Sequence, residues 1–223
     1  MTDPKVSAAI TGALQAFSKY DGYDATTLNA TFETVFVSDD TFLKKVDALD
    51  NIFDENPKVE ELREVFFDLL LVNFFSEDVK KLEDDYLETP EWEKIEEQTL
   101  DRGTELLNLL LYLNECEDED IDPELEDYLK EFLLVDEDEF QDEYRIYEPV
   151  ISNQILIESP ASEINKVAQS LPEDSELKEL FYPMMCFFQN TQPSGAEKEA
   201  IASDAVNTSF DMAVLEILVS FNE

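Results

Sequence analysis

The segment PKVEELREVFFDLLLVNFF, residues 57–75, decides the fold because its character changes halfway along. The apolar residues of its first half fall on one helical face, at Val59, Leu62 and Val65. Its second half is apolar on nearly every side. An amphipathic helix lies on a surface, whereas a helix that is apolar all round is buried all round. The segment therefore predicts a helix whose second half lies at the centre of the domain.

The rest of the chain also spaces its apolar residues as helices do. With 4 Gly and 9 Pro in 223 residues, it has too few turn formers for a fold rich in strands and tight turns. Hydrophobic residues make up 43% of the chain, which is enough for a substantial core despite the high charge. We therefore predict an all-α fold, an irregular domain of about ten or eleven helices. A solenoid-like helical stack is the alternative, and no hairpin is expected.

No low-complexity linker divides the chain, so residues 1–223 are predicted to form a single α-helical domain. The stretch TQPSG, residues 191–195, is the clearest connector and precedes the C-terminal helix. An acid followed by proline marks helix starts at Asp3 and Asp122. Residues 149–158 suit a bent helix better than a short extended piece. The other predicted helices are residues 4–21, 25–37, 39–53, 57–75, 76–88, 90–115, 123–135, a helix capped by Asp136, one starting at Pro160, 173–189 with a kink at Pro183, and 196–221.

The charge of the chain is extreme, because 55 acidic residues face 15 basic ones and give a formal net charge of -40. The negative charges of such a surface repel one another, nucleic acid and anionic membranes, and they attract basic proteins or cations. The acids are densest from Glu115 to Glu143. Within that stretch Leu129, Phe132 and Leu133 would dock a helix onto the core while the acids project outward. The pattern indicates an anionic strip held in place by an apolar anchor.

Several classes of enzyme are disfavoured by the residues that the chain lacks. It has no histidine, the commonest metal ligand and the side chain best suited to proton transfer near neutral pH. It has no glycine-rich phosphate loop and no basic patch with interleaved aromatic residues. Its two cysteines, Cys116 and Cys186, match no disulfide framework. We therefore predict a non-enzymatic protein without catalytic residues, cofactor or metal site.

Two acidic patterns are alternatives to that prediction. Residues 120–131 place acids as a calcium-binding loop would, but Leu125 occupies the position that requires glycine, and a helix start explains the pattern better. Carboxylates on two packed helices could instead hold Mg²⁺ in an all-α nucleotide hydrolase. Acids are so frequent that such sets arise by chance on nearly every helix, and a solvated face is the favoured interpretation. The two sets are Glu61, Glu64 and Asp68, and Glu93, Glu97 and Asp101.

The start of the chain, MTDPKVSAAITGALQAF, carries an acid where a signal peptide has basic residues. The longest apolar runs are far shorter than the ~20 residues that a bilayer requires. We therefore expect a soluble, cytoplasmic protein.

The charge suggests a function in binding. The leading hypothesis is a protein that binds a basic protein partner, as an inhibitor, an immunity protein against a cationic toxin or nuclease, or a chaperone. It would bind neither nucleic acid directly nor membranes. A narrower alternative is a DNA mimic, since acids on adjacent helices are spaced much as phosphates are. A further alternative is that the charge serves only solubility or salt adaptation. The predicted contact residues are Glu117, Asp118, Glu119, Asp120, Asp136, Glu137, Asp138, Glu139, Asp142 and Glu143.

Overall fold

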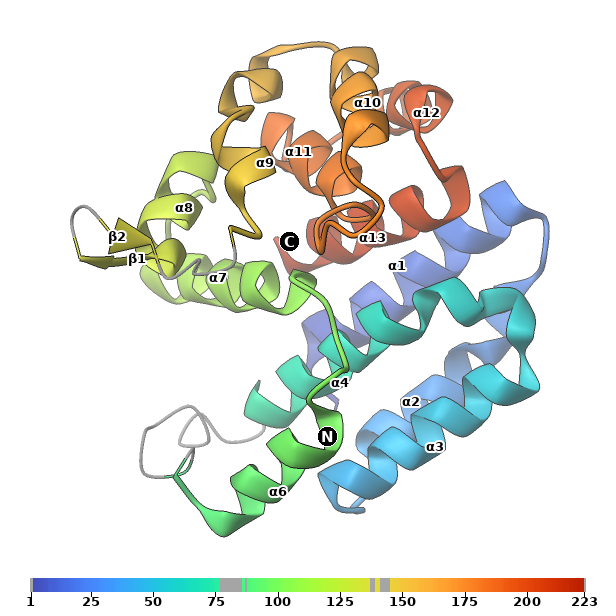
Figure 1. Ribbon diagram of the computed structural model, residues 1–223. Coiled ribbons are helices and arrows are strands. Elements are labelled where there is room, and N and C mark those ends of the chain that lie inside the picture. The colour runs from blue at the N-terminus through green and yellow to red at the C-terminus, as the bar shows by residue number, and fades with distance from the viewer. Residues whose placement is uncertain (1, 77–85, 87, 137–138, 141–144, 223) are drawn as a thin grey trace.

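The chain folds into helices joined by short connectors, and this computed structural model describes residues 2–76, 86, 88–136, 139–140 and 145–222 (Figure 1). For residues 131–136 and 139–140 it describes the backbone alone. The predicted all-α class is confirmed. The α-helices of the described part are α1 (Pro4–Asp21), α2 (Asn29–Val37), α3 (Phe42–Glu55), α4 (Arg63–Ser76), α6 (Pro90–Thr99), α7 (Leu106–Glu119), α8 (Leu125–Leu133), α9 (Glu148–Ile151), α10 (Ala161–Ser170), α11 (Phe181–Gln189), α12 (Gly195–Asp204) and α13 (Thr208–Phe221). The described residues also form three 3-10 helices, η1 (Ala25–Leu28), η2 (Pro57–Leu62) and η4 (Gln154–Glu158).

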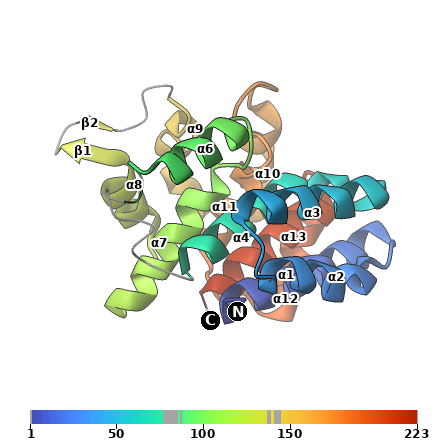
Figure 2. The same ribbon diagram turned by 90° about the horizontal axis from the view of Figure 1, so that it is seen from below.

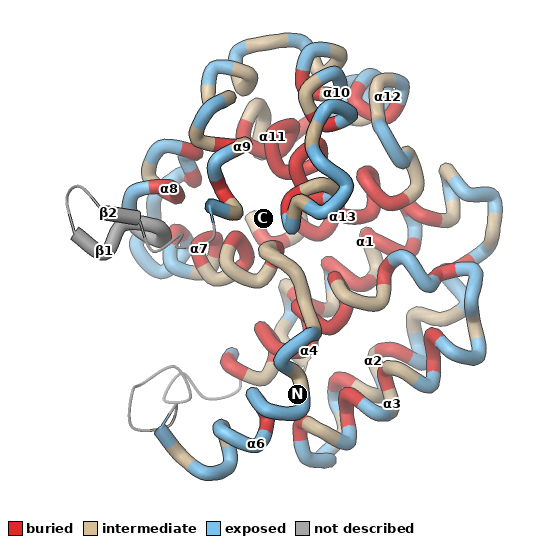
Figure 3. The backbone as a smooth tube through the Cα atoms, in the orientation of Figure 1, coloured by how far each residue is buried: buried red, intermediate tan, exposed pale blue. Residues whose placement is uncertain are grey.

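The predicted central helix is α4, and its position is confirmed. Every residue from 65 to 73 is buried, and the corresponding tube is red over most of its length in Figure 3. The amphipathic first half of the segment differs from the prediction, because residues 57–62 form the 3-10 helix η2 and the α-helix begins only at Arg63. The buried apolar residues of α4 belong to one cluster that extends from Val6 to Phe221.

Helices α1 and α13 lie side by side along the core, in Figure 1 and in the view from below in Figure 2. Gly12 permits this close approach, because a Cβ at that position would stand 3.3 Å from the Ser220 hydroxyl oxygen. The predicted ends of α1 are confirmed. The Asp3 side chain accepts a 2.8 Å hydrogen bond from the Lys5 N–H, and Gly22 ends the helix in the left-handed conformation with φ 84°.

The predicted helix over residues 90–115 is wrong, because the chain turns between α6 and α7. Gly103 adopts φ 85°, a conformation that a helix interior does not contain. The Thr104 hydroxyl then accepts a hydrogen bond from the Leu106 N–H at 3.1 Å and so begins α7 as a cap does. The turn places α6 apart from α7 in Figure 1.

The C-terminal helix predicted over residues 196–221 is two helices, α12 and α13. The buried carboxylate of Asp211 accepts hydrogen bonds from the N–H groups of Val206 and Asn207, which helix continuation would have used internally. Val206 is consequently 45% exposed. The helix predicted over residues 173–189 is also shorter, because α11 begins at Phe181 and Pro183 lies in its first turn, where proline is tolerated without a kink.

The acidic stretch after α8 departs from the prediction as well. The helix ends at Leu133, and β1 (Leu134–Asp136) pairs antiparallel with β2 (Glu139–Phe140), so the expectation of no hairpin and of a helix capped by Asp136 is wrong. A helix through this stretch would align like charges three and four residues apart, which is unfavourable. Residues 149–158 are mostly helical, because α9 and η4 cover them except for a turn at 152–153. The helix predicted over 76–88 lies mostly outside the described residues. None of the described helices combines the length and apolar character needed to cross a bilayer.

Candidate anionic interaction surface

Four of the predicted contact residues, Glu117 to Asp120, form the exposed end of α7. A helix C-terminus carries partial negative charge, so acids there are destabilising and bases are favoured. The last turn of α7 nevertheless contains Glu117, Asp118 and Glu119 and no basic residue. Helix stability therefore does not explain these acids, which favours a role outside the fold.

Asp120 adds a second unfavourable feature at the same place. It ends α7 with φ 56°, in the left-handed conformation that glycine adopts most readily. The Asp120 N–H donates to the Glu117 carbonyl oxygen at 3.1 Å, and the Ile121 N–H donates to the Cys116 carbonyl oxygen at 2.9 Å. This is the hydrogen-bond pattern of a Schellman motif, with aspartate at the glycine position.

The corner between α7 and α8 is held rigidly against the core. The Tyr112 hydroxyl is fully buried and bridges Glu124, donating to its carbonyl oxygen at 3.1 Å and accepting from its N–H at 3.0 Å. Leu125, Tyr128 and Leu129 are buried, as the sequence predicted for Leu129. Exposed carboxylates of Asp122 and Glu124 follow the corner, so the acids are presented from a fixed framework.

One lysine reaches this surface from the start of α1. Lys5 Nζ lies 2.5 Å from Glu117 Oε2, with 17% of the lysine side chain exposed. The pair borders a polar hollow of about 350 Å³, where the first turn of α1 meets the last turns of α7 and α13. Sequence reasoning missed Lys5 because it lies far from the acidic stretch along the chain. The hollow is lined by Lys5, Leu113, Cys116, Glu117, Asp120, Ile121, Asp122, Gln192, Phe221 and Asn222.

We define the acidic corner as Glu117, Asp118, Glu119, Asp120, Asp122 and Glu124. Among the described residues, no ion pair involves Asp118, Glu119 or Asp120. The backbones of the predicted residues Asp136 and Glu139 lie in β1 and β2, but their side chains are outside the described part. Glu137, Asp138, Asp142 and Glu143 also lie outside the described residues.

Several bases elsewhere in the part of the chain that the structure describes already form ion pairs. Lys198 Nζ lies 2.7 Å from Glu216 Oε2, and Lys166 Nζ lies 2.5 Å from Glu163 Oε1. Lys19 likewise pairs with Glu199. Because acids exceed bases by 40, internal pairing leaves most carboxylates without a counter-charge from the protein. Apart from the pairing of Lys5 with Glu117, counter-charge for the acidic corner must come from ions or from a partner.

The carboxylates considered for Mg²⁺ are separated by the fold. Glu61 is exposed and accepts hydrogen bonds from Asn207 Nδ2 at 2.8 Å and from the Ser209 hydroxyl at 3.0 Å. Glu93 and Glu97 lie on α6 and are exposed, as is Asp101 in the turn that follows it. Within the described ranges, no group of three or more acidic or cysteine side chains has the geometry to hold a metal ion.

The Glu64 carboxylate accepts hydrogen bonds from the turn between α6 and α7. It accepts from the Gly103 N–H at 2.8 Å and from Arg102 Nε at 3.0 Å. The same guanidinium makes two further bonds of 3.0 Å to the Asp50 carboxylate, which Arg63 also contacts at 2.9 Å. The arginines therefore tie α3, α4 and the turn together, and this arrangement is structural.

Asp68 is fully buried beneath the same turn. Thr104 donates to it from its N–H at 3.0 Å and from its hydroxyl at 2.5 Å. Burial raises the pKa of Asp68 to about 8, although the two bonds from Thr104 favour the ionised form. The only sequence signal for this contact was Gly103, one of four glycines in the chain.

Comparison with known protein families, curated proteins and solved structures finds no significant match to this chain.

Proposed function

We propose that this protein is a non-enzymatic binder of a basic protein partner, and that the acidic corner is part of its contact surface. The single observation that carries the proposal is the end of α7, where Glu117, Asp118 and Glu119 stand against the helix dipole with no base in the last turn. An arrangement that lowers the stability of the free protein is expected where a partner supplies the missing positive charge. An inhibitor, an immunity protein or a chaperone for a basic client would use such a surface.

The sign of the charge supports a protein over other partners. At a net charge of -40, phosphate backbones and anionic lipids are repelled, while a cationic protein is drawn in by long-range steering. The buried anchors Leu125 and Leu129 keep the acidic corner in place before binding, so little order has to be gained on contact. Pre-organised acids on rigid helices suit a specific complex better than solubility alone requires.

The proposal is tested by capture from native lysate on the immobilised full chain, with elution at rising salt. The variant Asp118→Lys with Glu119→Lys is compared with the matched variant Glu96→Lys with Glu97→Lys, which reverses two exposed acids of α6. We expect a stoichiometric basic protein that wild type and the α6 variant retain and that the α7 variant loses. Equal retention by all three proteins would exclude the acidic corner as the contact surface.

The same experiment separates the DNA-mimic alternative. If the captured partner binds DNA and adding this protein releases that DNA, this protein binds at the partner's nucleic-acid site. That result would support a DNA mimic. If the partner binds the protein and DNA simultaneously, mimicry is excluded while the binding function stands.

A further inference from the structure

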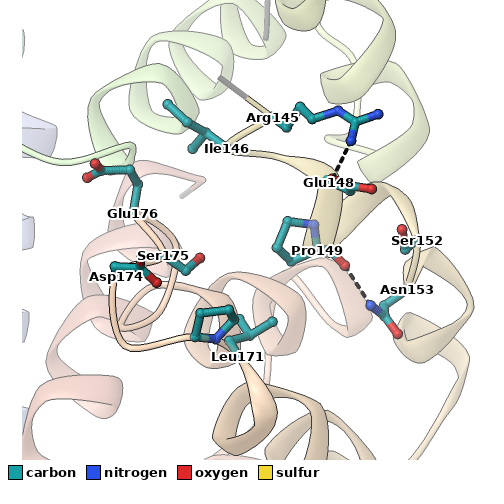
Figure 4. Close-up of a pocket in the computed structure, with 11 residues that line it drawn as sticks. Arg145, Ile146, Glu148, Pro149, Ser152, Asn153, Leu171, Asp174, Ser175 and Glu176 are labelled. Carbon is teal, nitrogen blue, oxygen red and sulfur yellow. Dashed lines mark hydrogen bonds and ion pairs between the residues drawn. The ribbon is translucent and has the colours of Figure 1, made fainter. Parts of the chain in front are cut away.

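A groove distant from the acidic corner along the chain runs between two connectors. One wall is residues 145–153, which include α9, and the other is residues 171–176, which join α10 to α11. The two walls face each other in Figure 4, with Asp174, Ser175 and Glu176 on one side and Glu148 and Pro149 on the other. The groove is open to solvent and has a volume of about 890 Å³, within the range of ~300–1,000 Å³ typical of ligand sites.

Both walls are held by hydrogen bonds to neighbouring side chains, so the groove is preformed. In the first wall, Tyr147 is buried, and its hydroxyl donates to Glu105 Oε2 at 2.6 Å and accepts from the Tyr128 hydroxyl at 2.9 Å. In the second wall, Lys178 Nζ donates to the Leu171 carbonyl oxygen at 2.7 Å and pairs with Glu173 at 3.2 Å. A site that exists before binding loses little conformational entropy when it is filled.

The lining combines apolar surface with carboxylates that have no counter-charge. Pro149, Leu171 and Pro172 contribute apolar surface to the lining. Asp174 and Glu176 are exposed, and no ion pair involves either of them in the part of the chain that the structure describes. Arg145 is the one base among the described residues that line the groove, and it already lies 3.6 Å from Glu148, so this lining as a whole is negative.

We propose that this groove binds an extended segment of a basic protein, with an arginine or lysine side chain of that segment seated between the two walls. The aliphatic part of such a side chain would cover Leu171 and the prolines, while its charged end would reach Asp174 and Glu176. An arginine would bind more tightly than a lysine, because its planar guanidinium can contact carboxylates with two parallel hydrogen bonds. Ser152 and Ser175 offer hydroxyls to the backbone of the segment.

Other occupants fit this lining poorly. Nucleotides and lipid headgroups bring phosphate toward unpaired carboxylates, and a second copy of the chain brings another net charge of -40. A purely apolar ligand would leave Asp174 and Glu176 partly desolvated without a partner. The inference rests on the proposed function and extends it, since the groove would be a second contact region for a basic partner.

The probe for the test is a fluorescein-labelled heptapeptide of alternating arginine and leucine, titrated into the full chain at about 150 mM salt, where charges beyond about 8 Å are screened. Three variants are compared with wild type. Asp174→Asn with Glu176→Gln removes two charges from the groove, and Ser152→Trp fills the groove without changing its charge. Glu96→Gln with Glu97→Gln is the matched control, because it removes two exposed charges from α6, which belongs to neither proposed contact region.

We expect each of the two groove variants to weaken peptide binding about tenfold, the effect of losing roughly one charge-assisted contact, and the control to change it less than about twofold. Wild-type affinity in Ser152→Trp, equal losses in both charge-removing variants, or no saturable binding to wild type would overturn the groove site. None of these results bears on the capture experiment with the α7 variant. Failure of the groove and failure of the proposed function are therefore distinguishable.

Discussion

Gly103 lies directly against Asp68, since a Cβ at position 103 would stand only 2.6 Å from Asp68 Oδ1 and 3.2 Å from the Phe67 ring. The backbone of Gly103 is also left-handed, with φ 85°. One residue without a side chain therefore allows the turn between α6 and α7 to close on the central helix. This contact positions Thr104 over the buried carboxylate and Arg102 over Asp50 and Glu64.

We expect Gly103→Ala to lower the free energy of unfolding by about 3 kcal/mol, from backbone strain and from collision with buried atoms. Gly22→Ala is the matched control, because Gly22 has φ 84° and nothing lies within 4 Å of the added Cβ. That control measures only the free-energy cost of a side chain on a left-handed backbone, about 1 kcal/mol. Urea denaturation gives both values, and equal losses in the two variants would contradict the close contact with Asp68.

Replacing Asp120 with glycine should stabilise the protein, whereas Gly103→Ala should destabilise it. Asp120→Gly removes left-handed strain and a negative charge at the end of α7, so we expect the free energy of unfolding to rise by about 1 kcal/mol. Asp120→Ala removes the charge and keeps the strain, and it should gain less. A partner captured by wild type should bind Asp120→Gly more weakly. A variant that is neither more stable nor weaker in binding would show that Asp120 has no special role.

Much of the architecture could be predicted from apolar spacing and caps. The all-round apolar half of residues 57–75 correctly indicated α4 at the centre, and Asp3 with Gly22 correctly indicated the ends of α1. Two of the errors share one cause. The side chains of Asp68 and Asp211 accept hydrogen bonds from the N–H groups of Thr104 and Val206, and these bonds interrupt helices that periodicity alone continues. Such side-chain hydrogen bonds leave no periodic trace in the sequence.

The candidate site could likewise be predicted from the sequence only in part. Charge density along the chain identified Glu117 to Asp120, which the structure places together at the end of α7. It could not identify Lys5, which joins them from another helix, or the groove formed by residues 145–153 and 171–176. Both depend on which connectors meet in space, and composition carries no information on that.

Two buried carboxyls make stability depend on pH in an unusual direction. Burial raises the pKa of Asp211 to about 7, against the bonds from the Asn207 and Val206 N–H groups that favour ionisation. The pKa of Asp68 is raised to about 8. The folded state therefore holds protons that the unfolded state has released. The contribution of these two groups to stability is greatest below the ordinary aspartate range and falls as pH rises toward 7 to 8, by at most about 1.4 kcal/mol per pH unit for each group.

We expect the wild-type protein to be more stable at about pH 5 than at about pH 7.5, and Asp211→Asn to reduce that difference. Asparagine keeps an oxygen that can accept from the Val206 and Asn207 N–H groups, so the break between α12 and α13 is preserved. Asp118→Asn, an exposed change, is the control for general loss of negative charge. Urea denaturation at both pH values measures the effect, and an identical pH response in the two variants would contradict the buried titration of Asp211.

Salt should stabilise the free protein, because the acidic corner and the remaining unpaired carboxylates repel one another at a net charge of -40. Raising NaCl from about 10 mM to about 150 mM shortens the Debye length from about 30 Å to about 8 Å, so we expect the melting temperature to rise over this range. Asp118→Lys with Glu119→Lys changes the net charge to -36, since each reversal adds two charges, and it should reduce the salt response. Calorimetric scans of both proteins test this. A melting temperature independent of salt would mean that bound cations already neutralise the surface, and the acidic corner would then not be free to attract a basic partner.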